Sequence, residues 1–199
     1  MGSVSSSGFS AADAQGDFSR ARRARLLADI GRRLRREPDD VGLILPFEEV
    51  VDALGVVGRS DEGLQVVPLD AIVGTVDRSV DFDRGFRPTS ARLRSRWERI
   101  AAAQRRGEAL PPISLFQVGD LFFVRDGHHR VSVAKSLGRE DIDAYVTDVQ
   151  TRVRLGRDLR VGDLPLKGHD RLFRERVPLS PEQRAEISLT DPWDFGTLA

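Results

Sequence analysis

The sequence predicts an α/β (α+β) protein with a small mixed sheet, flanking helices and a helical arm in front of it. Two observations support this fold class. Short apolar runs, typical of buried strands, alternate with amphipathic segments of helical period. One such strand, Leu121–Arg125, stops at Asp126 and Gly127, a pair that favours a turn, and the following residues change to helical spacing.

The composition excludes several classes of protein. A chain of 199 residues fits one domain of ordinary size with extensions. It contains no cysteine, which rules out disulfides, zinc sites built on thiolates and cysteine nucleophiles. No apolar run approaches the roughly 20 residues of a membrane span, and the first residues lack the pattern of a signal peptide. We therefore expect a soluble, cytoplasmic protein without a membrane partner.

Equal numbers of basic and acidic residues, 31 each, conceal an uneven distribution of charge. Residues 1–36 carry +5, residues 37–90 carry −8 and residues 91–199 carry +3. A basic segment can contact a polyanion, so DNA is a candidate partner for the first of these stretches. The overall charge does not indicate a long footprint on duplex DNA.

The N-terminal part predicts a tail and an arm. Residues 1–16, rich in Ser, Gly and Ala, predict a disordered tail. Residues 17–58 predict a basic helical arm, whose first helix, Phe18–Glu37, is lined on one side by Leu27, Ile30 and Leu34. We expect this stripe to pack on the domain, with the arginines either solvated or in contact with nucleic acid or an acidic partner. We also expect the chain to fold without residues 1–36.

The arm leads into the main domain. A short helix is expected at Pro46–Leu54, with Gly55 after its end, followed by a polar link at Gly58–Gly63. Leu64–Val67 then predicts a strand. A helical turn and a second short strand should follow, at Leu69–Ile72 and Val73–Val76.

A charged loop with aromatic residues, 77–88, separates these strands from the next helix, and long loops of this type are often functional. The helix should run from Thr89 or Ser90 to Arg106, with Trp97 facing inward. The next two strands, Ile113–Val118 and Leu121–Arg125, read as a tight hairpin.

The last part of the chain predicts one more helix, one more strand and an extension. The helix ends near Gly138, and the strand Ile142–Thr147 completes the sheet. Residues 149–199 show weaker patterns, and we expect them to pack on the domain. Within them we expect a short helix at Pro181–Leu189 and docking of the aromatic residues near Trp193.

The strongest candidate site lies at the start of the helix that ends near Gly138. Backbone N–H groups at a helix start favour phosphate, Gly127 allows close approach of the backbone, and Arg130 offers a planar fork. The residues predicted to bind the phosphate-bearing ligand are Asp126, Gly127, His128, His129, Arg130, Ser132 and Arg78. The simpler alternative is a capped turn with solvated histidines. We expect no metal held by protein side chains alone, although Asp126 could help to hold Mg²⁺ through phosphates.

The order of these segments resembles the ParB/sulfiredoxin superfamily. Asp126–Arg130, a helix of small residues ending at Gly138 and the strand Ile142–Val146 are similar to its nucleotide-binding segment. The resemblance extends back to Val66–Ile72 and through Pro111–Ile113, so that it covers about residues 64–148. It implies a nucleotide ligand (ATP, ADP or CTP) with Mg²⁺. The absence of cysteine excludes the chemistry of sulfiredoxins themselves.

The chain departs in two ways from the pattern of ParB partition proteins, and both bear on function. Partition proteins of the ParB type carry an arginine-rich box where this chain has two histidines, and no helix-turn-helix pattern follows. The loop looks closer to that of the free-serine kinase branch, which implies an acidic base. Asp77, Asp81 or Asp83 could supply this base, and we take Asp81, Asp83 and His129 as the catalytic candidates. Ion pairing with neighbouring arginines is the simpler explanation of the aspartates.

Three functions therefore stay open at this point. The first is a nucleotide-binding ParB-like module that is regulatory or associated with DNA. The second is a nucleotide-dependent phosphotransferase acting on a small hydroxyl compound. The third is a metal-dependent nuclease. A homodimer is compatible with all three.

Overall fold

The structure, a computed structural model, describes residues 10–156, 158–177, 180 and 183. Over these residues it is a mixed α/β fold in which a six-stranded sheet carries helices on both sides and follows an N-terminal helix, as predicted. The strands are β1 (Leu45–Pro46), β2 (Val56–Pro68), β3 (Ile72–Thr75), β4 (Ile113–Val118), β5 (Leu121–Asp126) and β6 (Asp141–Thr151). The helices are α1 (Ser10–Leu34), α2 (Phe47–Leu54), α3 (Arg94–Arg105), α4 (His128–Ser136) and α5 (Leu164–Arg176).

The strand order is β1-β3-β5-β4-β6-β2. β3 and β5 are parallel neighbours near the centre, whereas β4 and β5 form the predicted antiparallel hairpin. β4 also pairs in parallel with β6. The carboxyl ends of β3 and β5 therefore lie at the same edge of the sheet, and the segments that follow both strands start there.

The sheet is longer than predicted. The expected polar link at Gly58–Gly63 is wrong, because these residues belong to β2, which pairs with β6 from Val56 to Pro68. β2 is an edge strand with much of its length exposed, so it tolerates polar residues and shows no apolar alternation. The sheet therefore reaches beyond the predicted boundaries of 64–148 at both ends.

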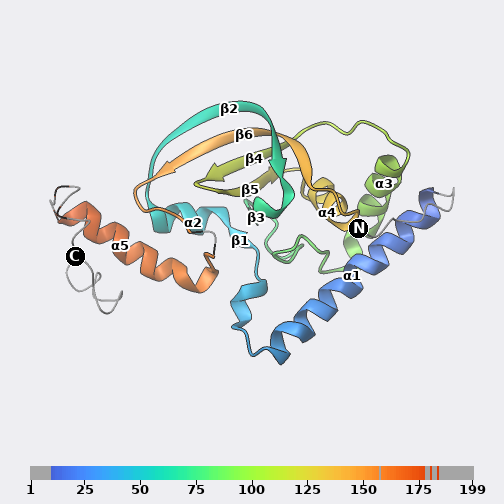
Figure 1. Ribbon diagram of the computed structural model, residues 1–199, viewed down its shortest axis with the longest axis horizontal. Helices are drawn as coiled ribbons and strands as arrows, with labels where there is room; N and C mark the ends of the chain where they lie inside the picture. Colours follow the sequence, from blue (N-terminus) through green and yellow to red (C-terminus); the bar gives the residue numbers. More distant parts are fainter. Residues whose placement is uncertain (1–9, 157, 178–179, 181–182, 184–199) are drawn as a thin grey trace.

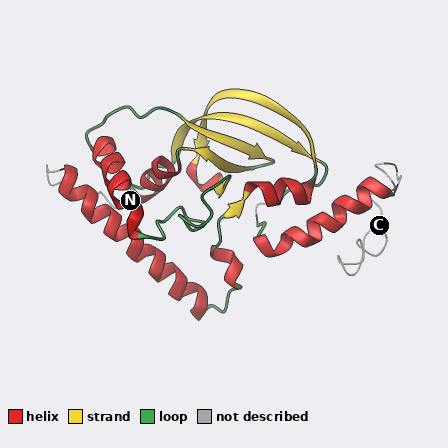
Figure 2. Cartoon of the chain, turned by 180° about the vertical axis from the view of Figure 1, so that it is seen from behind, coloured by secondary structure: helices red, strands yellow, loops and turns green. Residues whose placement is uncertain are grey.

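Two hydrophobic cores lie on the two faces of the sheet. The first is formed with α1, α3 and α4 and includes Phe18, Trp97 and Val131. The second is formed with α2 and α5 and includes Phe47 and Phe123. Figure 1 shows α1, α3 and α4 at one end of the molecule and α2 and α5 at the other, and Figure 2 shows the same division from behind.

Helix α1 is part of the first core. It begins at Ser10, so the prediction of a disordered tail is wrong for residues 10–16; residues 1–9 lie outside the described part. Phe18 is fully buried and meets Trp97 edge to face, with ring centroids 5.5 Å apart. Asp17 is also buried and accepts hydrogen bonds from Arg105 Nε and Nη2 at 2.7 and 3.0 Å. These contacts argue against the expectation that residues 1–36 are dispensable for folding.

The apolar stripe of the arm faces outward, contrary to prediction. Leu27, Ile30 and Leu34 are 68%, 53% and 80% exposed. Phe18 and Asp17 fix the rotation of α1 about its axis, and this rotation turns Arg25 and Arg32 toward the domain instead. The C-terminal half of α1 thus turns Arg25 and Arg32 toward the domain and its apolar side to solvent.

The helix α5 was not anticipated from the sequence. Leu164 and Phe173 are its buried residues, and α5 packs on α2. Pro165 at the first turn is a helix-start signal that could have indicated it. The expected helix at Pro181–Leu189 and the expected docking of the aromatic residues near Trp193 fall outside the described residues. No described helix is both long enough and apolar enough to cross a bilayer.

Candidate anion-binding site at the start of helix α4

The turn between β5 and α4 has a backbone that requires glycine. Gly127 lies in the left-handed region with φ of 102°. A Cβ atom there would overlap the side chain of Ile113, so the position also lacks space for any larger residue. The start of α4 has no side-chain cap, which leaves its first N–H groups available to an external acceptor.

The segment after β3 lies against this helix start. Thr75 Oγ1 and His128 Nε2 are 2.7 Å apart, and the Arg78 backbone N–H donates to the same Thr75 oxygen at 3.1 Å. Asp77 Oδ1 lies 3.5 Å from His128 Nε2. The parallel pairing of β3 and β5 thus brings the charged loop of residues 77–88 to the predicted phosphate site.

Both histidines are buried beside Phe82. The Phe82 ring stacks on His128 at a centroid distance of 6.4 Å and meets His129 edge to face at 5.5 Å. Burial lowers the pKa of His128, although Asp77 opposes the shift. Burial, assisted by Arg96 and Arg78, lowers the pKa of His129 to about 4. His129 is therefore neutral at pH 7, and its buried Nδ1 has no hydrogen-bond partner among the residues that the structure describes.

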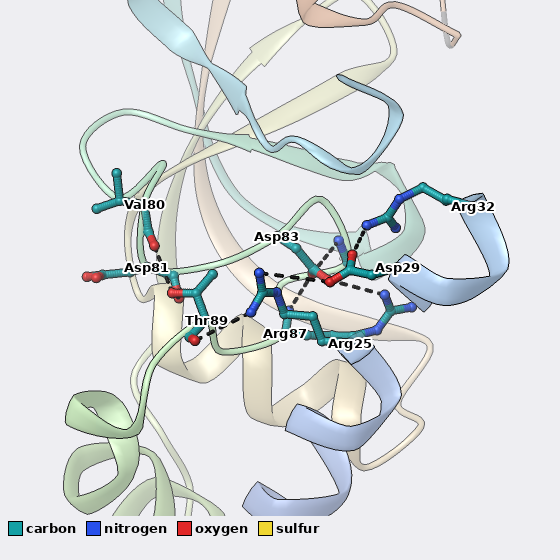
Figure 3. A network of polar contacts seen from close by, with 9 residues as sticks. Arg25, Asp29, Arg32, Val80, Asp81, Asp83, Arg87 and Thr89 are labelled. Atoms are coloured by element: carbon teal, nitrogen blue, oxygen red, sulfur yellow. Dashed lines mark hydrogen bonds and ion pairs between the residues drawn. The ribbon is translucent and has the colours of Figure 1, made fainter. Parts of the chain in front are cut away.

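The two aspartates predicted as catalytic are held within the loop. Burial raises the pKa of Asp81, but hydrogen bonds from Arg92 and Arg78 outweigh burial, so that the pKa is lowered. Asp83 accepts hydrogen bonds from the backbone N–H groups of Gly85 and Arg87, at 2.9 and 2.8 Å. Figure 3 shows Asp83 and Asp81 in the network that ties the loop to α1. Both carboxylates are buried, whereas the side chain of Asp77 is 62% exposed.

Arg130 is fixed at the other side of the helix start. It donates to the carbonyl oxygens of Pro111 and Pro112, at 2.5 and 2.9 Å, and pairs with the exposed carboxylate of Asp126. The guanidinium group of Arg130 thus links α4 to the segment before β4. Its Nη1 contacts the two carbonyl oxygens, and its Nη2 contacts Asp126. A cavity of about 320 Å³ borders Arg130 and includes Arg139 in its lining.

Ser132 does not join the site. Its buried hydroxyl accepts a hydrogen bond from Trp97 Nε1 at 2.8 Å and so faces the first core. Ser132 follows His128 by about one helical turn and so lies beyond the first N–H groups of α4. The prediction of Ser132 as a phosphate ligand is therefore not supported by its position.

The sequence reasoning missed Thr75 and Phe82, which position the two histidines. A small polar residue at the end of a short strand is the signal that could have indicated Thr75. Among the described residues, no group of three or more His, Asp or Glu side chains is arranged to hold a metal ion. Any Mg²⁺ here would have to be held partly by ligand phosphates.

Acid should destabilise the fold through His129. Its pKa is about 4 in the folded chain and 6.5 ordinarily. Between these values the unfolded chain binds a proton that the folded chain does not, so stability present above pH 6.5 decreases as the pH falls toward 4. The loss from this residue is at most about 3 kcal/mol. Urea unfolding of the wild type and of His129→Gln at the two pH limits measures it; an equal acid loss in both proteins would exclude His129 as the cause.

Comparison with known proteins adds little to this geometry. No family model and no curated protein matches the chain. Among solved structures, sulfiredoxin from Arabidopsis thaliana is similar over 44% of this chain and 86% of its own, with 18% identity and a TM-score of 0.31. A likeness of this degree carries no argument about function, so the site must be interpreted from its own residues.

Proposed function

We propose that the chain binds the phosphates of a nucleotide (ATP, ADP or CTP, with Mg²⁺) at the start of α4. The observation that carries the proposal is the start of α4 itself, where no side chain caps the first N–H groups and where His129, the second residue of the helix, has a buried Nδ1 without a hydrogen-bond partner among the described residues. A buried polar group without a partner costs about 1–3 kcal/mol, which a ligand oxygen would recover. Because His129 is neutral, Nδ1 can carry a proton and donate it in a hydrogen bond to such an oxygen.

Two further features support a phosphate rather than another acceptor. The positive end of the α4 dipole and the N–H groups after Gly127 favour an anion. Arg130 is held in place by two carbonyl oxygens, while its partner Asp126 is exposed. Exposed ion pairs are weak, so a phosphate can replace Asp126 on a fork that is already positioned.

Substitution of Arg130 tests the proposal. Arg130→Ala should weaken nucleotide binding by about 10- to 150-fold, since a charge-assisted hydrogen bond contributes roughly 1.5–3 kcal/mol. It should also lower the melting temperature, because the carbonyl groups of Pro111 and Pro112 lose their donor. Arg130→Lys keeps the charge without the fork and should recover only part of the affinity. Calorimetric titration with ATP, ADP, CTP and GTP in the presence of Mg²⁺ decides; equal affinities in all three proteins would remove Arg130 from the site.

A phosphotransferase acting on a small hydroxyl compound is the second candidate, and the position of Asp77 favours it. Asp77 is exposed and lies next to His128, and no arginine of the described residues holds its carboxylate in place, unlike those of Asp81 and Asp83. We therefore propose Asp77 as the general base if the bound nucleotide reacts. Product formation from ATP or ADP and a panel of small alcohols, lost in Asp77→Asn with nucleotide affinity retained, would support this activity; a fully active variant would exclude the role.

A further inference from the structure

The outer side of α1 forms an exposed apolar stripe with basic surroundings. The stripe consists of Leu26, Leu27, Ile30 and Leu34, all more than half exposed. Residues 20–36 contain eight arginines and one aspartate, a net charge of +7. The helix is already formed and anchored by its other side at Phe18, so the stripe is presented without a cost of folding on binding.

A second exposed apolar surface lies on the sheet and has acidic surroundings. Leu64 of β2 pairs with Tyr145 of β6, and Val66 pairs with Asp143, so these side chains share one face of the sheet. Leu64, Val66 and Tyr145 form the sheet patch. All three are exposed because α2 and α5 cover only the other end of the sheet (Figure 1). The flanking segments, 61–68 and 140–146, contain five acidic residues and no basic residue.

We propose that the stripe of one copy of this chain docks on the sheet patch of a second copy. Apolar side chains would be buried on both sides, and the basic rim would meet the acidic rim. Pairing of two α1 stripes is disfavoured because it would bring together two segments of net charge +7. The zero net charge of the whole chain leaves little long-range repulsion between copies.

This contact is heterologous, since two different surfaces meet. In a closed dimer, the stripe of each copy would dock on the patch of the other. Alternatively, further copies would add head to tail and form a chain. Either arrangement predicts that one intact stripe and one intact patch, on different molecules, are enough for association. That requirement separates the proposal from self-pairing of α1.

Sedimentation velocity of three full-length proteins tests the proposal. The wild type should associate with increasing concentration, and less at high salt. A stripe variant, Leu27→Glu with Ile30→Glu, and a patch variant, Leu64→Lys with Val66→Lys, should each be monomeric. An equimolar mixture of the two variants should associate again, because the first keeps the patch and the second keeps the stripe. Leu43→Glu, at an exposed leucine outside both surfaces, is the matched control and should associate like the wild type.

Several outcomes would overturn the proposal. A mixture that stays monomeric would exclude the heterologous contact, and a patch variant that associates like the wild type would indicate α1–α1 pairing. A monomeric wild type that binds anionic phospholipid vesicles or duplex DNA through the stripe would assign that surface to lipid or nucleic acid. Thermal melts confirm folding of each variant, since the replaced side chains are all exposed.

Discussion

Replacement of Gly127 by alanine is expected to weaken nucleotide binding by about 100-fold and to destabilise the fold. The left-handed backbone at this position costs a non-glycine residue about 1–2 kcal/mol. The added Cβ would also overlap Ile113, so the turn between β5 and α4 must move. A displaced turn loses the alignment of the N–H groups with the ligand, and loss of two hydrogen bonds corresponds to about a 100-fold lower affinity.

Gly138→Ala is the matched control for this substitution. Gly138 has a similar positive φ of 71°, at the other end of α4, but a Cβ there would meet open space. The Gly138→Ala variant should lose only the stability that a positive φ costs a non-glycine residue, and its nucleotide affinity should be unchanged. Calorimetric titration and urea unfolding of both variants separate the two effects. Wild-type affinity in Gly127→Ala would show that the turn is not part of the binding site.

Removal of the Phe18 ring should be the most destabilising single change in α1. Phe18 is fully buried against Trp97, and Phe→Ala in a core typically costs about 3–5 kcal/mol. That loss is a large fraction of the roughly 5–15 kcal/mol by which a domain is stable. Leu27→Ala, nine residues further along the helix, removes an exposed side chain and should change the unfolding free energy by less than about 0.5 kcal/mol.

Urea unfolding of the two variants measures this contrast. Similar stabilities would mean that α1 is not anchored by Phe18, and the truncation of residues 1–36 would then be tolerated as the sequence first indicated. A large difference confirms that the first half of α1 belongs to the core. The arm is then not a detachable basic segment.

The sequence predicted best those elements whose signals are local. The hairpin β4–β5 and the helix α4 follow from apolar runs, a glycine turn and a change of period, so their places could be predicted closely. β2 could not be predicted over its full length, because an exposed edge strand needs no apolar alternation and depends on pairing with β6, distant in sequence. The outward stripe of α1 could not be foreseen either, since the rotation of α1 is set by Arg105 and Trp97 of α3.

The candidate site shows the same limit. Gly127, His128, His129 and Arg130 are adjacent in sequence, and their position at a helix start was predictable from the turn and the helical spacing. Thr75, Asp77 and Phe82 come from the end of β3 and the loop after it, about 50 residues earlier, and only the parallel pairing of β3 and β5 brings them near. The choice among Asp77, Asp81 and Asp83 depended on which carboxylates the loop arginines occupy, and no spacing in the sequence encodes that.

The most direct test of the phosphate site is an amide nitrogen–proton correlation spectrum of the full chain during titration with ATP, ADP or CTP and Mg²⁺. If nucleotide binds at the start of α4, the largest chemical-shift changes should occur at the backbone amides of Gly127–Arg130, with smaller changes in Thr75–Phe82. These are the N–H groups at the start of α4 and the loop that lies against them. Changes confined to α1 or to the α2–α5 end of the molecule, or the absence of any change at saturating nucleotide, would contradict the assignment of this site.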